Sequence, residues 1–336
     1  MRLLQKLFAI STLLASGVAS AEVRIVQQES GVKVRLRGIS AVSPDIAWAS
    51  GREGTVLRTI DGGKQWQVIK VPGAEALDFR DIEGFDAEIA VALSIGPGEA
   101  SRVYRTQDAG KTWTLALQNR DPRAFFDCMV FDGNNGWMLA DPVEGYFQIH
   151  ATNDGGNTWR LLPQGPRAEE GEAAFAASGS CIARVRGALV IGTGGGRARF
   201  HVLPDGKAHW KSIDSGMSRS KSQAGVFSLA PTAFGMFAVG GDYVAERASG
   251  NASQWRAGDK QNPVIRLIAP RGYRSGVACL DGAPACLAVG PSGVDAWNAA
   301  AWKSVSDVGY DAIDIIGNVG WTSGDAGRIA RVEVSD

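Results

Sequence analysis

A tryptophan that recurs at a nearly constant interval constrains the fold of this chain more than any other feature. In its first three copies it ends a motif in which Thr stands two residues before Asp, Gly follows, and Trp comes five residues after the Asp. The tryptophans lie 45–51 residues apart, and they are Trp66, Trp113, Trp159, Trp210, Trp255 and Trp302. A period of this length, rich in Gly and strand-forming residues, is typical of propeller blades and not of helical solenoids.

A second recurring tryptophan, upstream of the first, indicates the number of copies. Trp48 and Trp321 occupy equivalent positions and are separated by close to six periods, which predicts seven blades. The seventh copy ends after its third strand, so we expect residues 23–28 to supply its outer strand and to remove the open edges of the ring. The sequence therefore predicts an all-β protein, a seven-bladed β-propeller with four-stranded blades closed by the N-terminal strand. Residues 22–336 form its single domain.

The repeated Asp is predicted to stabilise the hairpin between the third and fourth strands of each blade. Its carboxylate can accept backbone N–H groups across the turn, while Gly takes the positive φ and Trp packs between blades. Residues repeated in every blade serve the repeat, so we favour this interpretation over catalysis or Ca²⁺ binding. The predicted structural residues are Asp61, Trp66, Asp108, Trp113, Asp154, Trp159, Asp205 and Trp210, the last pair belonging to a degenerate copy.

Residues 1–21 have the pattern of a signal peptide. Arg2 and Lys6 precede an apolar stretch of about 12 residues, and Ala19-Ser20-Ala21 is a small-residue cleavage site. An uncleaved anchor is the alternative, but roughly 20 apolar residues are needed to span a bilayer. No Cys follows the stretch for lipid attachment, and no later segment predicts an integral membrane anchor. We expect a periplasmic or secreted protein, and its formal net charge of zero argues against a nucleic-acid partner.

The four cysteines suggest disulfides, because an exported protein matures in an oxidising compartment. Cys279 and Cys286 flank a short turn between two predicted strands, which brings their Cα atoms into disulfide range. Cys128 and Cys181 occupy equivalent positions in neighbouring blades, so a bridge between them stays open. Buried free thiols are the alternative for both pairs.

Several segments together resemble a known family. The Thr-x-Asp…Trp motif resembles the Asp-box of the bacterial neuraminidase repeat. The other segments are 126–131, 136–142, 224–230, 240–243, 272–275 and 290–293. Across residues 36–336 the chain resembles the exported propellers of the photosystem II stability and assembly factor family. That resemblance implies a non-enzymatic seven-bladed propeller that escorts membrane-complex subunits and has a protein client. Photosynthetic members carry a lipid-anchoring Cys or a plastid transit sequence, which is not seen here, so the client is left open.

A sialidase-like glycoside hydrolase or glycan-binding propeller is the second hypothesis, because it shares the fold and the Asp-box. Such an enzyme requires an arginine cluster for the substrate carboxylate and a Tyr paired with a Glu. The arginine motif of that family is absent, and the nearest string is Phe79-Arg80-Asp81-Ile82. The Gly-rich string 191–197 has Arg197 where a dinucleotide loop requires Gly, and no helix follows it. We expect neither a cofactor nor a metal. We also expect the protein to be a monomer.

Any binding site is expected at the end of the channel where first strands begin and second strands end. Loops at such positions vary while the scaffold repeats. Mixed Arg and Asp side chains there suit a peptide segment that carries its own charges. The predicted partner-binding residues are Arg80, Asp127, Asp141, Arg197, Asp242, Arg274 and Ser292.

Overall fold

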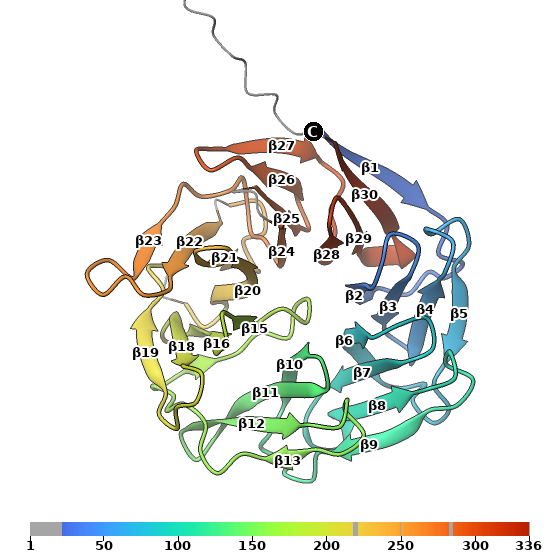
Figure 1. Cartoon of the computed structure of the whole chain (residues 1–336), viewed down its shortest axis with the longest axis horizontal. Helices are drawn as coiled ribbons and strands as arrows, with labels where there is room; N and C mark the ends of the chain where they lie inside the picture. The colour runs from blue at the N-terminus through green and yellow to red at the C-terminus, as the bar shows by residue number, and fades with distance from the viewer. Residues whose placement is uncertain (1–21, 218–220, 249, 282–284, 336) are drawn as a thin grey trace, which may run out of the picture.

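The computed structural model describes residues 22–217, 221–248, 250–281 and 285–335; the predicted signal peptide, residues 1–21, lies outside them. Seven blades of antiparallel strands surround a central axis (Figure 1). This arrangement confirms the predicted all-β, seven-bladed propeller with four-stranded blades. In the part of the chain described, helical structure is limited to two short 3₁₀ turns, η1 (Gly98–Ala100) and η2 (Asp325–Gly327).

Each blade runs from an inner strand at the axis to an outer strand at the rim. The first three blades are β2 (Leu36–Ala41), β3 (Ala47–Gly51), β4 (Thr55–Thr59) and β5 (Gln67–Lys70); β6 (Asp78–Gly84), β7 (Ala90–Ile95), β8 (Arg102–Thr106) and β9 (Thr114–Gln118); and β10 (Phe126–Asp132), β11 (Asn135–Val143), β12 (Tyr146–Thr152) and β13 (Arg160–Leu161). The fourth and fifth are β15 (Ile182–Val185), β16 (Ala188–Gly192), β18 (Arg199–Leu203) and β19 (Lys211–Asp214), then β20 (Ala224–Thr232), β21 (Gly235–Asp242), β22 (Asn251–Arg256) and β23 (Val264–Arg266).

The sixth blade is β24 (Gly276–Cys279), β25 (Cys286–Gly290), β26 (Gly293–Trp297) and β27 (Trp302–Ser306). The seventh is β28 (Ala312–Ile316), β29 (Val319–Ser323), β30 (Ile329–Ser335) and β1 (Glu22–Gln28). Two short strands, β14 (Glu172–Ala173) and β17 (Gly194–Gly195), extend the fifth sheet beyond its inner strand β20.

The N-terminal strand closes the ring, as predicted. β1 pairs antiparallel with β30 along its whole length, from Glu22 opposite Ser335 to Gln28 opposite Ile329. The Gln28 side chain continues the closure into the first blade, where it donates to the Gly62 carbonyl at 2.9 Å and accepts from the Trp66 indole at 3.0 Å. The start and the end of the domain are therefore held in one sheet.

The core consists of apolar side chains packed between neighbouring blades. The second strands are buried on both faces, and every residue of β3 and β16 is buried. Trp48 and Trp321 occupy the equivalent position in the first and last blades and are fully buried. This burial explains why these segments are continuous apolar runs instead of the alternating pattern of a half-exposed strand.

The first three Asp-box hairpins have the predicted chemistry. In the second blade, the Asp108 carboxylate accepts from the Thr112 backbone at 2.8 Å and from the Thr106 hydroxyl at 2.9 Å. The Thr106 hydroxyl oxygen accepts in turn from the Gly110 backbone at 2.9 Å. Asp61 and Asp154 make the equivalent bonds. These bonds lower the pKa of the Asp154 carboxyl to about 2, chiefly through Thr158.

The fourth copy differs. Asp205 keeps its spacing to Trp210, but Leu203 stands where the other copies have Thr. Without that hydroxyl the motif cannot form the Thr–Asp link, and in the portion described no hydrogen bond involves the Asp205 carboxylate. This hairpin closes instead with a backbone bond from Lys207 to the Pro204 carbonyl at 3.1 Å.

Two disulfides join the four cysteines. Cys279 and Cys286 face each other across β24 and β25. Cys128 and Cys181 join the third blade to the fourth, which is the pairing that the sequence left open, and both are buried. The described residues contain no helix that has both the length and the apolar character to cross a bilayer.

Candidate binding site at the channel mouth

One position of the inner strand points into the mouth of the channel in several blades. The pairing of inner and second strands skips one residue in four blades, and each skip is a β-bulge. A bulge leaves the extra residue unpaired and re-aims its side chain. The bulged residues are Arg37, Arg80, Asp127 and Phe227, and all four line one cavity.

A second repeated position completes the wall of this cavity. It lies where the second strand of a blade ends or has just ended, and it is filled by Arg52, Ile95, Asp141 and Pro291. We call the space between the two sets the mouth cavity. It has a volume of about 490 Å³, and its remaining lining includes Arg35, Phe175, Tyr243, Glu246, Tyr273 and Asp311.

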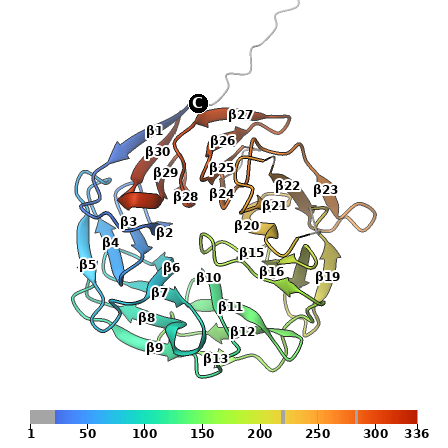
Figure 2. The ribbon, with the colours of Figure 1, turned by 180° about the vertical axis from the view of Figure 1, so that it is seen from behind.

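The floor of the mouth cavity is an irregular segment that crosses the channel. This channel segment, residues 174–180, lies between β14 and β15, and both views of the ring show the chain beside β15 reaching toward the centre (Figures 1 and 2). Arg80 donates to the Ala176 carbonyl at 2.8 Å, and Arg37 donates to the Ala177 carbonyl at 3.1 Å. The first and second blades thus hold a segment that comes from the opposite part of the ring.

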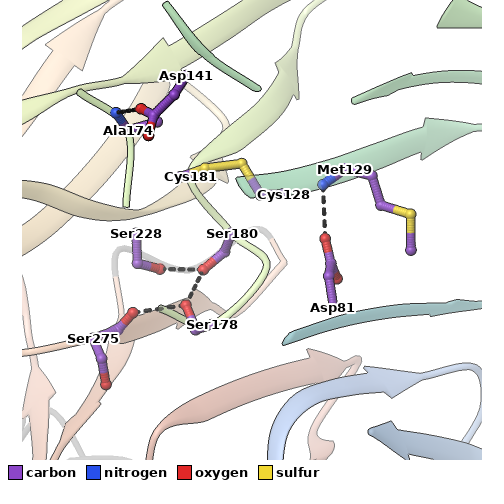
Figure 3. Close-up of a disulfide and its surroundings, with 10 residues drawn as sticks. All are labelled: Asp81, Cys128, Met129, Asp141, Ala174, Ser178, Ser180, Cys181, Ser228 and Ser275. Carbon is purple, nitrogen blue, oxygen red and sulfur yellow. Dashed lines mark hydrogen bonds between the residues drawn. A yellow bond between two sulfur atoms is a disulfide. The ribbon is translucent and has the colours of Figure 1, made fainter. Parts of the chain in front are cut away.

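The rest of the channel segment is held from other blades (Figure 3). The Ala174 backbone donates to Asp141 at 3.0 Å, and the Ser178 hydroxyl donates to the Ser275 carbonyl at 2.7 Å. Ser180 contacts Ser178 and Ser228, and the next residue forms the Cys128–Cys181 disulfide. Below the segment lies a second cavity of about 370 Å³, so the channel is divided into two chambers.

Arginines from the first two blades form one side of the mouth cavity. Arg35 makes a bidentate pair with Asp311, both contacts at 2.7 Å, and Arg80 pairs with Asp78 at 3.0 Å. Arg37 is different: it is 9% exposed, and within the described ranges no carboxylate lies at ion-pair distance from it. Burial lowers the pKa of the Arg37 guanidinium to about 10, because the charged form has lost water; the charge of Asp311 opposes this shift, and those of Arg80 and Arg35 add to it.

Two carboxylates from the third blade form the opposite side. Asp127 is 1% exposed, and its Oδ2 has no hydrogen-bond partner among the described residues. Burial, and secondarily the neighbouring Asp141 charge, raise the pKa of Asp127 well above its usual range. Burial also raises the pKa of Asp141 to about 6, although the Ala174 N–H counteracts part of that effect.

An aromatic group from the fourth to sixth blades forms the third side. Phe175 of the channel segment stacks on Phe227 with ring centroids 4.0 Å apart and planes 6° apart. Tyr273 and Tyr243 contact Phe227 edge-on, at 4.7 and 6.1 Å. Tyr243 is 47% exposed at the rim, so the apolar surface continues from the floor to solvent.

Three of the seven predicted partner-binding residues line this cavity, namely Arg80, Asp127 and Asp141. Arg274 does not: its side chain is fully buried and pairs with Asp295 and Ser292 inside the sixth blade. By register it is equivalent to Val226, one residue before the bulge position. A shift of one residue turns a strand side chain to the other face, so the prediction for Arg274 was wrong.

Ser292, Asp242 and Arg197 are likewise outside the cavity wall. Ser292 accepts from Arg274 at 2.9 Å, and it stands one residue after Pro291, which does line the cavity. Asp242 accepts from the Val244 backbone and pairs with Lys221 at 2.8 Å, so it closes its own loop. Arg197 pairs with Glu169 at 2.8 Å on the surface outside the mouth.

Sequence reasoning missed the unpaired arginine and the aromatic side. Arg37 could have been found, because Leu36-Arg37-Gly38-Ile39 aligns with Phe79-Arg80-Asp81-Ile82 once the inner strands are superposed by register. The same superposition places Phe227 in the mouth. Phe175 belongs to the irregular channel segment, which has no counterpart in the other blades and therefore no repeat signal.

The groups that glycoside hydrolysis would require are only partly present. Arginines converge at the mouth, and Tyr273 and Glu246 both line it. However, the hydrogen bond described between these two residues joins the Tyr273 backbone to the Glu246 carbonyl at 3.1 Å, and none joins the phenol to the carboxylate. Burial raises the pKa of the Tyr273 hydroxyl, which opposes formation of a nucleophilic phenolate.

The histidines and acidic groups do not assemble a metal centre in the ranges that the structure covers. His201 is fully buried between Glu172 and Ser212, each at 2.9 Å, and so anchors β14 to the fourth blade. Burial lowers the pKa of His150 to about 4, as for an imidazole packed in a core. His150 and His201 occupy the same position of the third strand in neighbouring blades, and the surroundings of each indicate a structural role.

Comparison with known proteins supports the resemblance drawn from the sequence. No protein-family model matches the chain. The curated Photosystem II assembly protein Ycf48 of Synechococcus sp. (strain JA-2-3B'a(2-13)) is 28% identical over 130 residues, which is 38% of this chain and 36% of that protein's length. The aligned region thus spans about a third of the relative.

Two solved structures extend the likeness to the whole ring. One, titled YCF48 bound to D1 peptide, matches with a TM-score of 0.65 and 15% identity, covering 95% of this chain and 99% of that chain. The other, YCF48 from Cyanidioschyzon merolae, matches with a TM-score of 0.60 and 18% identity, covering 94% and 99%. The chain resembles these assembly-factor propellers, and at this identity the structural likeness concerns the fold.

Proposed function

We propose that this protein is an exported, non-enzymatic propeller that captures an extended segment of a client protein in the mouth cavity. Through that capture it assists the assembly or quality control of membrane or envelope proteins. The observation that carries the proposal is Arg37, a buried guanidinium without a carboxylate partner that faces an open cavity. A carboxylate of the client, from an acidic side chain or a chain terminus, would supply the missing charge-assisted hydrogen bonds.

The size and lining of the mouth cavity favour a peptide segment over a folded domain. A volume of about 490 Å³ accommodates a few side chains and not a whole globular surface. The stacked Phe175 and Phe227 offer an apolar wall for one of those side chains. The named relatives support this reading, since one is an assembly protein and another was solved with a peptide.

The proposal is tested by capture on an array of random decapeptides with free carboxyl termini. We expect the wild-type protein to retain a set of peptides enriched in carboxylates and in apolar side chains. Arg37→Gln should weaken their binding about tenfold or more, as for loss of a charge-assisted hydrogen bond. The matched control is Arg24→Gln on β1, whose side chain is 75% exposed at the rim. Equal capture by wild type and Arg37→Gln would contradict the proposed site.

The enzymatic alternative is tested on the same preparation with a fluorogenic sialoside. We expect no turnover above the uncatalysed rate. Turnover that is abolished by Tyr273→Phe would establish a glycosidase and overturn the non-enzymatic proposal. Export and the identity of the client are tested by cross-linking in the native cell, followed by fractionation and identification of the cross-linked proteins.

A further inference from the structure

The buried Asp127 carboxylate is the feature of the mouth cavity that the proposed capture of a carboxylate does not use. It lies at the bulge of β10, it lines the cavity, and it is 1% exposed. No residue in the described parts of the chain donates a hydrogen bond to it. A buried carboxylate without a donor is costly, because it has lost water and gained nothing in exchange.

The surroundings of Asp127 add negative charge and no positive charge. Asp141 follows on β11, and one of its oxygens accepts from the Ala174 backbone at 3.0 Å. No Lys, Arg or His within the described ranges lies at ion-pair distance from either carboxylate. The arginines of the mouth are engaged elsewhere, Arg35 with Asp311 and Arg80 with Asp78. The other titratable groups of the lining are Arg37, Arg52, Tyr243, Glu246 and Tyr273.

We propose that Asp127 and Asp141 form a second subsite, which binds a positively charged side chain, Lys or Arg, of the captured segment. This inference rests on the proposed peptide-binding function and specifies it. A client would then carry a basic residue for this subsite as well as a carboxylate for Arg37. Because the two subsites lie on different blades of one cavity, a segment must present both charges to fill it, which is a more selective requirement than either charge alone.

The subsite has a predictable pH response. Both carboxyl groups have raised pKa values, and that of Asp141 is about 6, so part of the population has a protonated Asp141 near pH 6 in the free protein. A cationic side chain binds the deprotonated form, so binding should release protons, and the affinity should rise as pH increases from 5 to 8. A peptide without the basic residue should lack that proton release.

The experiment uses the full protein and one captured decapeptide that contains Lys, beside the same peptide with norleucine in place of Lys. Titration calorimetry in two buffers of different ionisation enthalpy gives the affinity and the protons released. We expect the norleucine peptide to bind wild type about tenfold or more weakly, in line with loss of a charge-assisted hydrogen bond. Asp127→Asn should reduce both the preference for the Lys peptide and the number of protons released, because Asp141 alone then remains in the subsite.

The matched control is Asp132→Asn, on the same strand but 64% exposed, which should retain the preference for Lys. If Asp127→Asn does not fold, Asp141→Asn makes the same test at a less buried position. Titration with CaCl₂ alone examines a divalent cation as the occupant; Ca²⁺ binding that Asp127→Asn abolishes would overturn the proposal.

The possible results distinguish failure of the second subsite from failure of the proposed peptide capture. Peptides that bind through Arg37 but show no preference for Lys, or keep that preference undiminished in Asp127→Asn, would overturn the second subsite and leave the proposed function standing. Absence of any captured peptide would overturn both.

Discussion

Arg37 and Asp127 occupy the same position of the repeat, the bulged residue of the inner strand, in the first and third blades. Both side chains turn into the mouth cavity, and both are buried charges without a partner of opposite sign in the described residues. Their opposite charges reflect a substitution at one structural position, not two separate devices. The repeat thus provides the geometry, and the residue type at the bulge determines what each blade contributes to binding.

Removal of a mouth charge should not destabilise the fold, whereas removal of a buried paired charge should. Arg37→Gln and Asp127→Asn each remove an uncompensated buried group, which offsets the loss of the Arg37 bond to the Ala177 carbonyl, so we expect little change in the melting temperature of either variant. Arg274→Gln removes the fully buried partner of Asp295 inside the sixth blade and leaves that carboxylate only its pair with the more exposed Arg271, so it should cost about 3 kcal/mol. Chemical denaturation of the three variants measures this contrast. A loss of stability in Arg37→Gln equal to that in Arg274→Gln would mean that both arginines are structural.

Buried carboxylates at the other end of the channel should make the protein less stable as pH rises. Burial raises the pKa of Asp314 to about 6, above the 3.8 expected in the unfolded chain. The folded state therefore binds more protons, and this contribution to the free energy of unfolding is lost as pH rises through 6. Between pH 5 and 8 the loss is on the order of 1 kcal/mol for this group.

Asp314→Asn should flatten that part of the pH dependence, because the amide keeps an acceptor for the Ala41 N–H and carries no charge. Denaturant titrations at several pH values compare it with Asp45→Asn, an exposed control. If the two variants have parallel profiles, Asp314 is not the group responsible.

The two disulfides should differ in their contribution to stability. Cys128–Cys181 closes a separation of 53 residues and Cys279–Cys286 one of 7, and a longer closed loop restricts the unfolded chain more. We expect Cys128→Ala with Cys181→Ala to lower the free energy of unfolding by about 2–4 kcal/mol. Cys279→Ala with Cys286→Ala should have the smaller effect. Mass spectrometry of non-reduced protein should first identify both linkages; free thiols at these positions would remove the basis of the comparison.

Deletion of the N-terminal strand should open the ring. Without residues 22–28, β30 loses its pairing partner and the Trp66 indole loses Gln28. An unpaired strand edge promotes association, so we expect a lower melting temperature and aggregation in light scattering. A monomeric deletion variant with unchanged stability would show that β1 is dispensable for closure.

Most of the fold could be predicted from the sequence alone, because the repeat is regular. The period predicted the blade number, and the incomplete seventh copy predicted the closure by β1. The binding site was harder to predict, because a position that faces the mouth cavity and a position that faces the core are adjacent in the same strand. Arg274 and Asp127 both begin inner strands, yet one is internal and the other faces the cavity, and only the register separates them. The channel segment could not be predicted, since an irregular insertion has no period.

Hydrogen exchange with and without a captured peptide tests the central claim most directly. The Asp-box hairpins lie at the ends of the third strands, and the mouth cavity lies at the beginnings of the inner strands, so a blade's length separates them. We expect peptide to slow exchange in the channel segment and in the first residues of β2, β6 and β10, with no change in the hairpins at 59–66, 106–113 and 152–159. Protection confined to those hairpins, or to the outer strands, would contradict a binding site at the mouth.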